Sequence, residues 1–156
     1  MYPATGFKKV DVINYYMEVS PVLLPHLKNR PISLKRYPDG VDGFFFYEKQ
    51  CPSHRPKWVD TARVLSRREA GFIDWSRNDE HKTTVCAYSL RAKDHPTVST
   101  PVTWKEVAEA KKRGDAALLT FDSKDVLSRI KRKGDLFEPV LTLKQKLPKI
   151  GSVAKI

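Results

Sequence analysis

Apolar and polar residues alternate in two different ways along the first third of the chain. Between residues 9 and 27 the apolar positions recur at helical spacing. Residues 32–37 then alternate as a strand does, a Pro-Asp-Gly turn follows, and residues 43–49 return as a second strand. This pattern predicts an N-terminal helix followed by a β-hairpin.

The rest of the chain predicts a second hairpin and two further helices. Residues 71–76 and 82–91 have the composition of strands and are joined by a polar turn. Thr103 and Glu106 form a capping box that begins one helix, and residues 123–133 carry an apolar stripe that ends in three basic residues and a glycine. The order predicts an α+β fold with two antiparallel β-hairpins, an N-terminal helix and two C-terminal helices.

The composition is that of one domain with a strong excess of positive charge. Lys and Arg number 29 against 18 acidic residues in a chain of 156, which gives a net charge of +11 and a pI near 9.7. Such a chain attracts polyanions by releasing their counterions, so we expect nucleic acid as its partner. A basic protein whose lysines are merely solvated stays open as the alternative.

The sequence predicts neither a membrane protein nor a protein stabilised by disulfide bonds. Its apolar runs are far too short to cross a bilayer, and its N-terminus lacks the apolar core of a secretory signal, so we expect a cytoplasmic protein with no membrane partner. Cys51 and Cys86 are too few for a disulfide scaffold or a four-ligand zinc site. We expect both as small buried hydrophobic residues.

Two long stretches of the chain resemble one known domain. Residues 2–59 contain YPATG, a K-x-D helix start, HLKNRPISLKRYPDGVDG and FFYEKQCP, and residues 71–107 read GFIDWSRNDEHKTTVCAYSLRAKDHPTVSTPVTWKEV. Both resemble the polymerase domain of bacterial ligase D, a member of the archaeo-eukaryotic primase-like superfamily. The resemblance implies an abridged primase-like domain over residues 1–140, in two parts (1–60 and 66–140), and leaves a basic tail at 141–156. It also implies a role in DNA double-strand-break repair by end joining.

The point where the two stretches meet departs from the family pattern. In the family a long central segment separates them and carries an Asp-x-Asp pair and a Ser-Gly-x-x-Gly-x-His motif, neither of which occurs here. Asp74 matches the family's third metal carboxylate and is our candidate for a catalytic and metal-binding residue. Two divalent ions require several convergent carboxylates, so catalysis by this chain alone is doubtful. We expect Mn²⁺ or Mg²⁺ if the chain is active and otherwise no cofactor. An exposed strand-end carboxylate without a metal is the alternative for Asp74.

The start of the first helix carries the candidate phosphate site. Lys9 matches the family lysine that binds the 5′-phosphate of a broken DNA end, and Lys8 lies beside it. A helix start favours anions because its amides are free and its dipole is positive there. A pair of solvated lysines is the alternative.

The first hairpin carries candidates for contact with bases and with the DNA backbone. Phe46 and Tyr47 match a family platform that stacks against a template base, and Lys35 and Arg36 lie on the partner strand. Strand alternation puts the two rings on opposite faces, so at most one can stack while the other enters the core. The alternative is that both rings are core residues. Further family positions that face nucleotide or DNA are matched by Arg77, Lys82 and Arg91.

Three functional hypotheses follow from the resemblance. The first is a DNA-binding member of the family, without full catalytic machinery, that recognises 5′-phosphorylated ends together with a ligase D ligase domain or a Ku-type end-binding protein. The second is an active nucleotidyltransferase whose missing metal ligands come from a partner chain. The third is a degenerate fragment. Loss of the central segment also predicts exposed apolar faces, and with them a rearranged fold, self-association or poor solubility.

Overall fold

The fold is described from a computed structural model, which covers residues 2–48, 51–57, 59, 61 and 84–144. Its elements are η1 (Pro3–Thr5), α1 (Lys9–Leu27), β1 (Leu34–Arg36), β2 (Phe46–Glu48), β3 (Ser89–Leu90), β4 (Val98–Ser99), α2 (Trp104–Arg113), η3 (Ala116–Leu119), α3 (Ser123–Lys133) and α4 (Pro139–Thr142). Both strand pairs are antiparallel, which confirms the α+β class. None of the described helices is long and apolar enough to cross a membrane.

Helix α1 has the predicted bounds and continues through two prolines. Pro21 has no N–H to donate, so the carbonyl of Met17 loses its usual helical partner. The hydroxyl of Ser20 donates to that carbonyl at 2.8 Å and replaces the missing bond. The local sequence therefore compensates for a residue that commonly ends a helix.

The second strand pair differs from the predicted one. Strands β3 and β4 pair Ser89 with Ser99 and Leu90 with Val98. The predicted strand over 82–91 is wrong between residues 84 and 88, which form an irregular segment and a turn. Within it Tyr88 takes a left-handed backbone conformation, with φ of 66°. Its side chain is buried, and this tertiary packing overrides the local preference for a strand. The other predicted strand, residues 71–76, lies outside the described residues.

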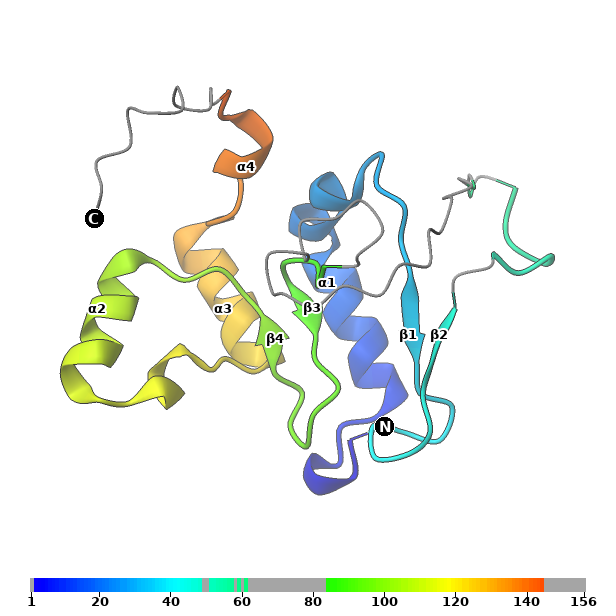
Figure 1. The fold of residues 1–156 in the computed structure, drawn as a ribbon, viewed down its shortest axis with the longest axis horizontal. Helices are drawn as coiled ribbons and strands as arrows, with labels where there is room; N and C mark the ends of the chain where they lie inside the picture. The colour runs from blue at the N-terminus through cyan, green and yellow to red at the C-terminus, as the bar shows by residue number, and fades with distance from the viewer. Residues whose placement is uncertain (1, 49–50, 58, 60, 62–83, 145–156) are drawn as a thin grey trace, which may run out of the picture.

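The core lies between α1, the β3–β4 pair and α3. Its buried side chains are Tyr15, Val19, Leu23, Tyr88, Val98 and Val126. The hydroxyl of Tyr15 donates to the carbonyl of Tyr88 at 2.8 Å, so the polar end of this core tyrosine has a partner. Figure 1 shows α1 in the middle, the β1–β2 hairpin on one side of it, and β4, α3 and α2 on the other.

A buried polar network closes one end of this core. The imidazole Nε2 of His26 lies 2.8 Å from Asp135 Oδ2, and the hydroxyl of Tyr88 donates to Asp135 Oδ1 at 2.6 Å. Burial raises the pKa of Asp135, but the hydrogen bonds from Tyr88 and His26 outweigh it and hold that pKa below its usual value. The network joins α1 to the segment after α3, which is a structural role for His26.

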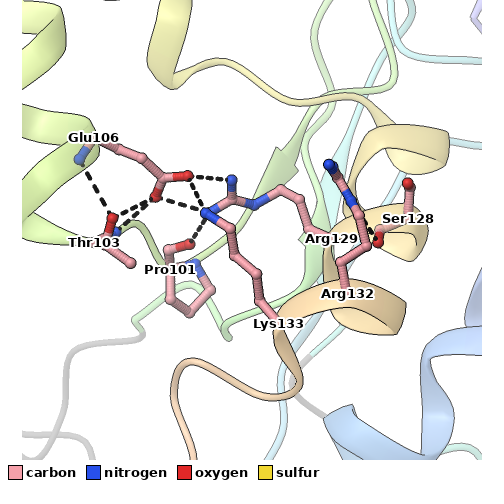
Figure 2. Close-up of polar contacts among 7 residues, drawn as sticks. All are labelled: Pro101, Thr103, Glu106, Ser128, Arg129, Arg132 and Lys133. Carbon is pink, nitrogen blue, oxygen red and sulfur yellow. Dashed lines mark hydrogen bonds and ion pairs between the residues drawn. The ribbon is translucent and has the colours of Figure 1, made fainter.

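An ion-pair cluster fixes α2 against α3, as Figure 2 shows. The guanidinium of buried Arg129 donates to both carboxylate oxygens of Glu106, at 2.5 and 3.0 Å, and to the carbonyl of Pro101 at 3.2 Å. Lys133 Nζ also donates to Glu106 at 2.7 Å. Glu106 in turn accepts the backbone N–H of Thr103, which completes the predicted capping box. The hydrogen bond from Arg129 is the largest reason why the pKa of Glu106 lies far below its usual value.

Large apolar side chains remain exposed on α1. They are Val10, Ile13, Met17 and Leu24. Their spacing places them along one line of the helix, whereas Tyr15, Val19 and Leu23 face the core. Helix α1 therefore has a second apolar face that no described element covers.

Candidate nucleic-acid interface

The β1–β2 hairpin places aromatic and basic side chains together on each of its faces. Its register pairs Lys35 with Tyr47 and Arg36 with Phe46. Because successive residues of a strand point to opposite faces, Lys35 and Tyr47 share one face, and Arg36 and Phe46 share the other. The predicted separation of the two rings is therefore present.

On the first face a lysine ammonium lies among three aromatic rings. The Nζ of Lys35 is 3.8 Å from the centre of the Phe45 ring, 5.0 Å from that of Tyr37 and 5.9 Å from that of Tyr47. These distances are those of cation–π contacts, which hold the ammonium in place without neutralising its charge. No ion pair to a carboxylate occurs for Lys35 among the described residues. No described carboxylate therefore competes with an anionic ligand for this cation.

On the second face the cation is already paired. The Nη1 atom of Arg36 donates to both carboxylate oxygens of Glu48, at 3.0 and 3.1 Å. Phe46 stacks with Phe44 at 6.2 Å between ring centres and 27° between ring planes. The two predicted backbone contacts, Lys35 and Arg36, are therefore not equivalent, because Glu48 neutralises only one of them.

Neither predicted stacking ring enters the core. Phe46 is 38% exposed and Tyr47 is 51% exposed. The expectation that one ring is buried is wrong, and so is the alternative in which both are. Alternation along a strand defines opposite faces, but burial also requires an element that covers one of them. No described element covers either face of this hairpin to that extent.

The two predicted phosphate ligands lie at the start of α1. Lys8 precedes the helix, Lys9 is its first residue, and both side chains are exposed. Asp11 reaches back to accept the backbone N–H of Lys8 at 2.7 Å. One of the free amides expected at this helix start is therefore occupied, and the two lysine side chains remain as candidate phosphate donors.

Arg91 lies directly after β3 and is half-buried. Its Nη1 donates to the hydroxyl of Ser99 at 3.3 Å, and its carbonyl accepts the hydroxyl of Tyr2 at 2.9 Å. Burial and the nearby hydroxyls of Tyr16 and Tyr37 raise the pKa of Tyr2 to about 12, so the Tyr2 hydroxyl stays a neutral donor. No described contact joins Arg91 to the hairpin face of Lys35.

Three predicted site residues, Asp74, Arg77 and Lys82, lie outside the described residues. Within the described part of the chain, no group of three or more His, Cys, Asp or Glu side chains could hold a metal ion. Cys51 is exposed, so the expectation of a buried hydrophobic residue is wrong there, whereas Cys86 is partly buried and packs against the core.

Sequence reasoning missed Tyr37 and Phe45, which complete the aromatic surroundings of Lys35. Once Lys35 is paired with Tyr47, counting two residues along each strand places Tyr37 and Phe45 on the same face. The missing information was the register, because the pattern predicted strands over residues 32–37 and 43–49 without stating which positions pair.

Exposed aromatic rings beside cations are a combination found in proteins that bind single-stranded nucleic acid. Comparison with known proteins defines the family. The family model of the LigD primase-polymerase domain matches residues 8–71 and 63–137. These matches cover most of the chain, which therefore belongs to the LigD primase-polymerase domain family.

Relatives and a solved structure agree with this assignment. The chain is 24% identical over 270 residues to the multifunctional non-homologous end joining protein LigD of Mycolicibacterium smegmatis, with 90% of the chain and 35% of that protein covered. It is 43% identical over 53 residues to the bifunctional LigD protein of Bacillus subtilis, with 34% of the chain and 9% of that protein covered. The solved polymerase domain of Mycobacterium tuberculosis ligase D, in complex with DNA, matches with a TM-score of 0.78 and 22% identity, over 90% of this chain and 94% of that chain.

The mycobacterial relatives, and the stretch of them that aligns with this chain, are longer than the chain itself. The chain spans about a third of the length (35%) of the mycobacterial relatives that it matches. The alignment with the Mycolicibacterium protein covers 270 residues, whereas this chain has 156. That relative therefore contains aligned positions without a counterpart here.

Proposed function

We propose that this chain binds 5′-phosphorylated DNA ends in double-strand-break repair by end joining, and that it does not catalyse nucleotidyl transfer alone. The observation that carries the proposal is the β1–β2 hairpin, where Lys35 lies among aromatic rings and has no carboxylate partner among the described residues. A base can stack on an exposed ring of the hairpin while a phosphate contacts the ammonium of Lys35. Stacking contributes about 1–3 kcal/mol per base, and it tolerates any base sequence.

Contact with the 5′-phosphate is assigned to Lys9, assisted by Lys8. Both ammonium groups are exposed at the N-terminal end of α1, where the helix dipole favours an anion. The Asp11 carboxylate accepts the backbone N–H of Lys8 and adds a negative charge nearby. The phosphate contact therefore depends on the two side chains more than on that backbone amide.

The donor set is too small for this chain to catalyse nucleotidyl transfer alone. Phosphoryl transfer with two divalent ions requires several carboxylates at one place. The chain contains no Asp-x-Asp pair, and Asp74 is the single carboxylate that matches a family metal ligand. The two-piece family match and the 270-residue alignment support the loss of an intervening segment. Mn²⁺ or Mg²⁺ would bind here with at most a weak protein donor set.

A second candidate function is favoured by the exposed face of α1. Val10, Ile13, Met17 and Leu24 form an apolar stripe of the kind that a further protein layer covers. A partner chain that packs on this stripe and supplies the missing metal ligands would give an active nucleotidyltransferase. A ligase D ligase domain and a Ku-type end-binding protein are the other partners that we propose, in the cytoplasm of a bacterial cell.

Binding and extension measured on one DNA substrate separate these functions. The protein is mixed with gapped, 5′-phosphorylated DNA, Mn²⁺ and ribonucleotides, and wild type is compared with Asp74→Ala. We expect equal DNA binding by both proteins and no primer extension by either. Extension by wild type that Asp74→Ala abolishes would show that this chain is an active polymerase. A degenerate fragment would show neither DNA binding nor a cooperative unfolding transition.

A further inference from the structure

Helix α2 presents the most exposed large hydrophobic side chain described in this protein. Trp104 is 87% exposed at the first position of the helix. Ala108 and Lys111 follow it at the i+4 and i+7 positions, and Lys105 and Lys112 lie on the neighbouring line of the helix. All four of these residues are exposed as well. One face of α2 therefore combines an indole, a small residue that leaves room beside it, and three lysines.

The positive charge on this face is not neutralised within the described residues. Helix α2 contains two carboxylates, and both are engaged elsewhere. Glu106 pairs with Arg129 and Lys133 of α3, and Glu109 pairs with Arg113. No ion pair of Lys105, Lys111 or Lys112 occurs in the described part of the chain.

The first turn of α2 is held firmly in place. Figure 2 shows Glu106 between Thr103 on one side and Arg129 and Lys133 on the other. Glu106 accepts from the Thr103 backbone at 2.8 Å and from Arg129 at 2.5 Å, so the turn that carries Trp104 is anchored to α3. The backbone at Trp104 is therefore already ordered, so a ligand that stacks on the indole has only the side-chain rotamer left to immobilise.

The charges on this face favour a polyanion over a protein or a membrane. Lys111 and Lys112 suit the C-terminal end of a helix, but Lys105 lies in the first turn, where the dipole disfavours a cation. Helix stability therefore does not explain Lys105. Lysine is depleted in protein–protein interfaces, which disfavours a protein occupant. The face has one large apolar side chain and no apolar stripe to insert into a lipid surface.

We propose that this α2 face, made of Trp104, Lys105, Ala108, Lys111 and Lys112, binds single-stranded nucleic acid. A base stacks on the exposed indole beside Ala108, and the lysines contact the flanking phosphates. Figure 1 shows α2 on the opposite side of α1 from the β1–β2 hairpin. The face is therefore a second contact, separate from the hairpin and from the 5′-phosphate site at Lys9.

The test measures binding of the full chain to a labelled oligothymidylate without a 5′-phosphate, as fluorescence anisotropy over a range of salt. Trp104→Ala is expected to weaken binding by about 5- to 100-fold and to leave the salt dependence unchanged. Trp104→Phe should recover most of the affinity. Replacing Lys105, Lys111 and Lys112 together by Gln should reduce the slope of log K against log salt by about 2.

Matched controls separate this face from general charge and from the hairpin. Lys28, Lys93 and Lys131 are exposed lysines elsewhere on the protein, and their joint replacement by Gln removes the same net charge. That control should change the slope by well under 1. The effect of Trp104→Ala should also persist in a Lys35→Gln background, and unchanged circular dichroism would show that α2 is intact.

Two results would overturn this second contact. One is oligonucleotide binding that Trp104→Ala leaves unchanged, which would point to a protein partner for the face. The other is an equal decrease in the salt slope for the two triple Lys→Gln variants. That result would show that the α2 face contributes only to the general positive charge of the protein. Because the oligonucleotide lacks a 5′-phosphate, neither result bears on end recognition by Lys9.

Discussion

The ammonium of Lys35 lies 3.8 Å from the centre of the Phe45 ring. Its neighbour Arg36 is instead paired with Glu48 on the opposite face of the hairpin. Two adjacent cations of the same strand thus differ in how much charge they offer to a ligand. That difference makes the hairpin account testable with a matched pair of variants.

Lys35→Gln should weaken DNA binding more than Arg36→Gln does. Removing an unneutralised cation that contacts a phosphate lowers the salt slope by about 0.7–0.9, whereas removing a cation already paired with a carboxylate changes it little. The measurement is a salt titration of affinity for gapped DNA. Equal slopes for the two variants would contradict the assignment of the phosphate contact to the Lys35 face.

Glu106→Gln should destabilise the protein by about 2–3 kcal/mol, because it leaves the buried guanidinium of Arg129 without its carboxylate. Urea unfolding at neutral pH measures this loss. Glu109→Gln is the matched control, since the Glu109–Arg113 pair is exposed and should cost no more than about 0.5 kcal/mol. An equal effect of the two variants would mean that the α2–α3 cluster adds no stability.

The lowered pKa of Glu106 also predicts how the stability of the protein changes at acid pH. The pKa of Glu106 is lower in the folded protein than in the unfolded chain, so its contribution to stability is fully present above the unfolded value of about 4.3. That contribution is lost as the pH falls below this value toward the folded one. Urea midpoints between pH 6 and pH 3 should therefore fall more steeply for wild type than for Glu106→Gln. Parallel curves would contradict this.

Tyr88→Phe should reduce stability by about 1–3 kcal/mol, because the Asp135 carboxylate loses a charge-assisted donor at 2.6 Å. The ring itself is kept, so the core packing and the backbone at position 88 remain as they are. Thermal or urea unfolding would measure the change. A variant as stable as wild type would show that His26 and the backbone N–H of Phe137, which donates to Asp135 Oδ1 at 2.8 Å, satisfy Asp135 without Tyr88.

The sequence predicted those features of the fold that depend on local periodicity. Helix α1 begins at Lys9 and ends at Leu27 as expected, because its apolar spacing is regular and Ser20 compensates for Pro21. The hairpin was also predicted, since a Pro-Asp-Gly turn separates two alternating runs. The strand predicted over residues 82–91 is wrong between residues 84 and 88, because burial of Tyr88 imposes a positive φ that local preference does not reveal.

Long-range relationships could not be predicted in the same way. Arg129 and Glu106 lie 23 residues apart, and no local pattern pairs them. The exposure of Phe46 and Tyr47 depends on whether another layer covers the hairpin, which alternation alone does not decide. The pairing of Arg36 with Glu48 required the register. For the candidate site, the residue types were therefore predictable, but their availability to a ligand was not.

Recognition of DNA ends through their 5′-phosphate is tested most directly by comparing affinities for one gapped duplex with and without the 5′-phosphate. The measurement is made in the absence of metal, for wild type and Lys9→Gln. We predict that wild type prefers the phosphorylated duplex by about tenfold or more, as expected for a charge-assisted contact of about 1.5–3 kcal/mol. We also predict that Lys9→Gln abolishes most of this preference. Equal affinity of wild type for the two duplexes would contradict recognition through the 5′-phosphate.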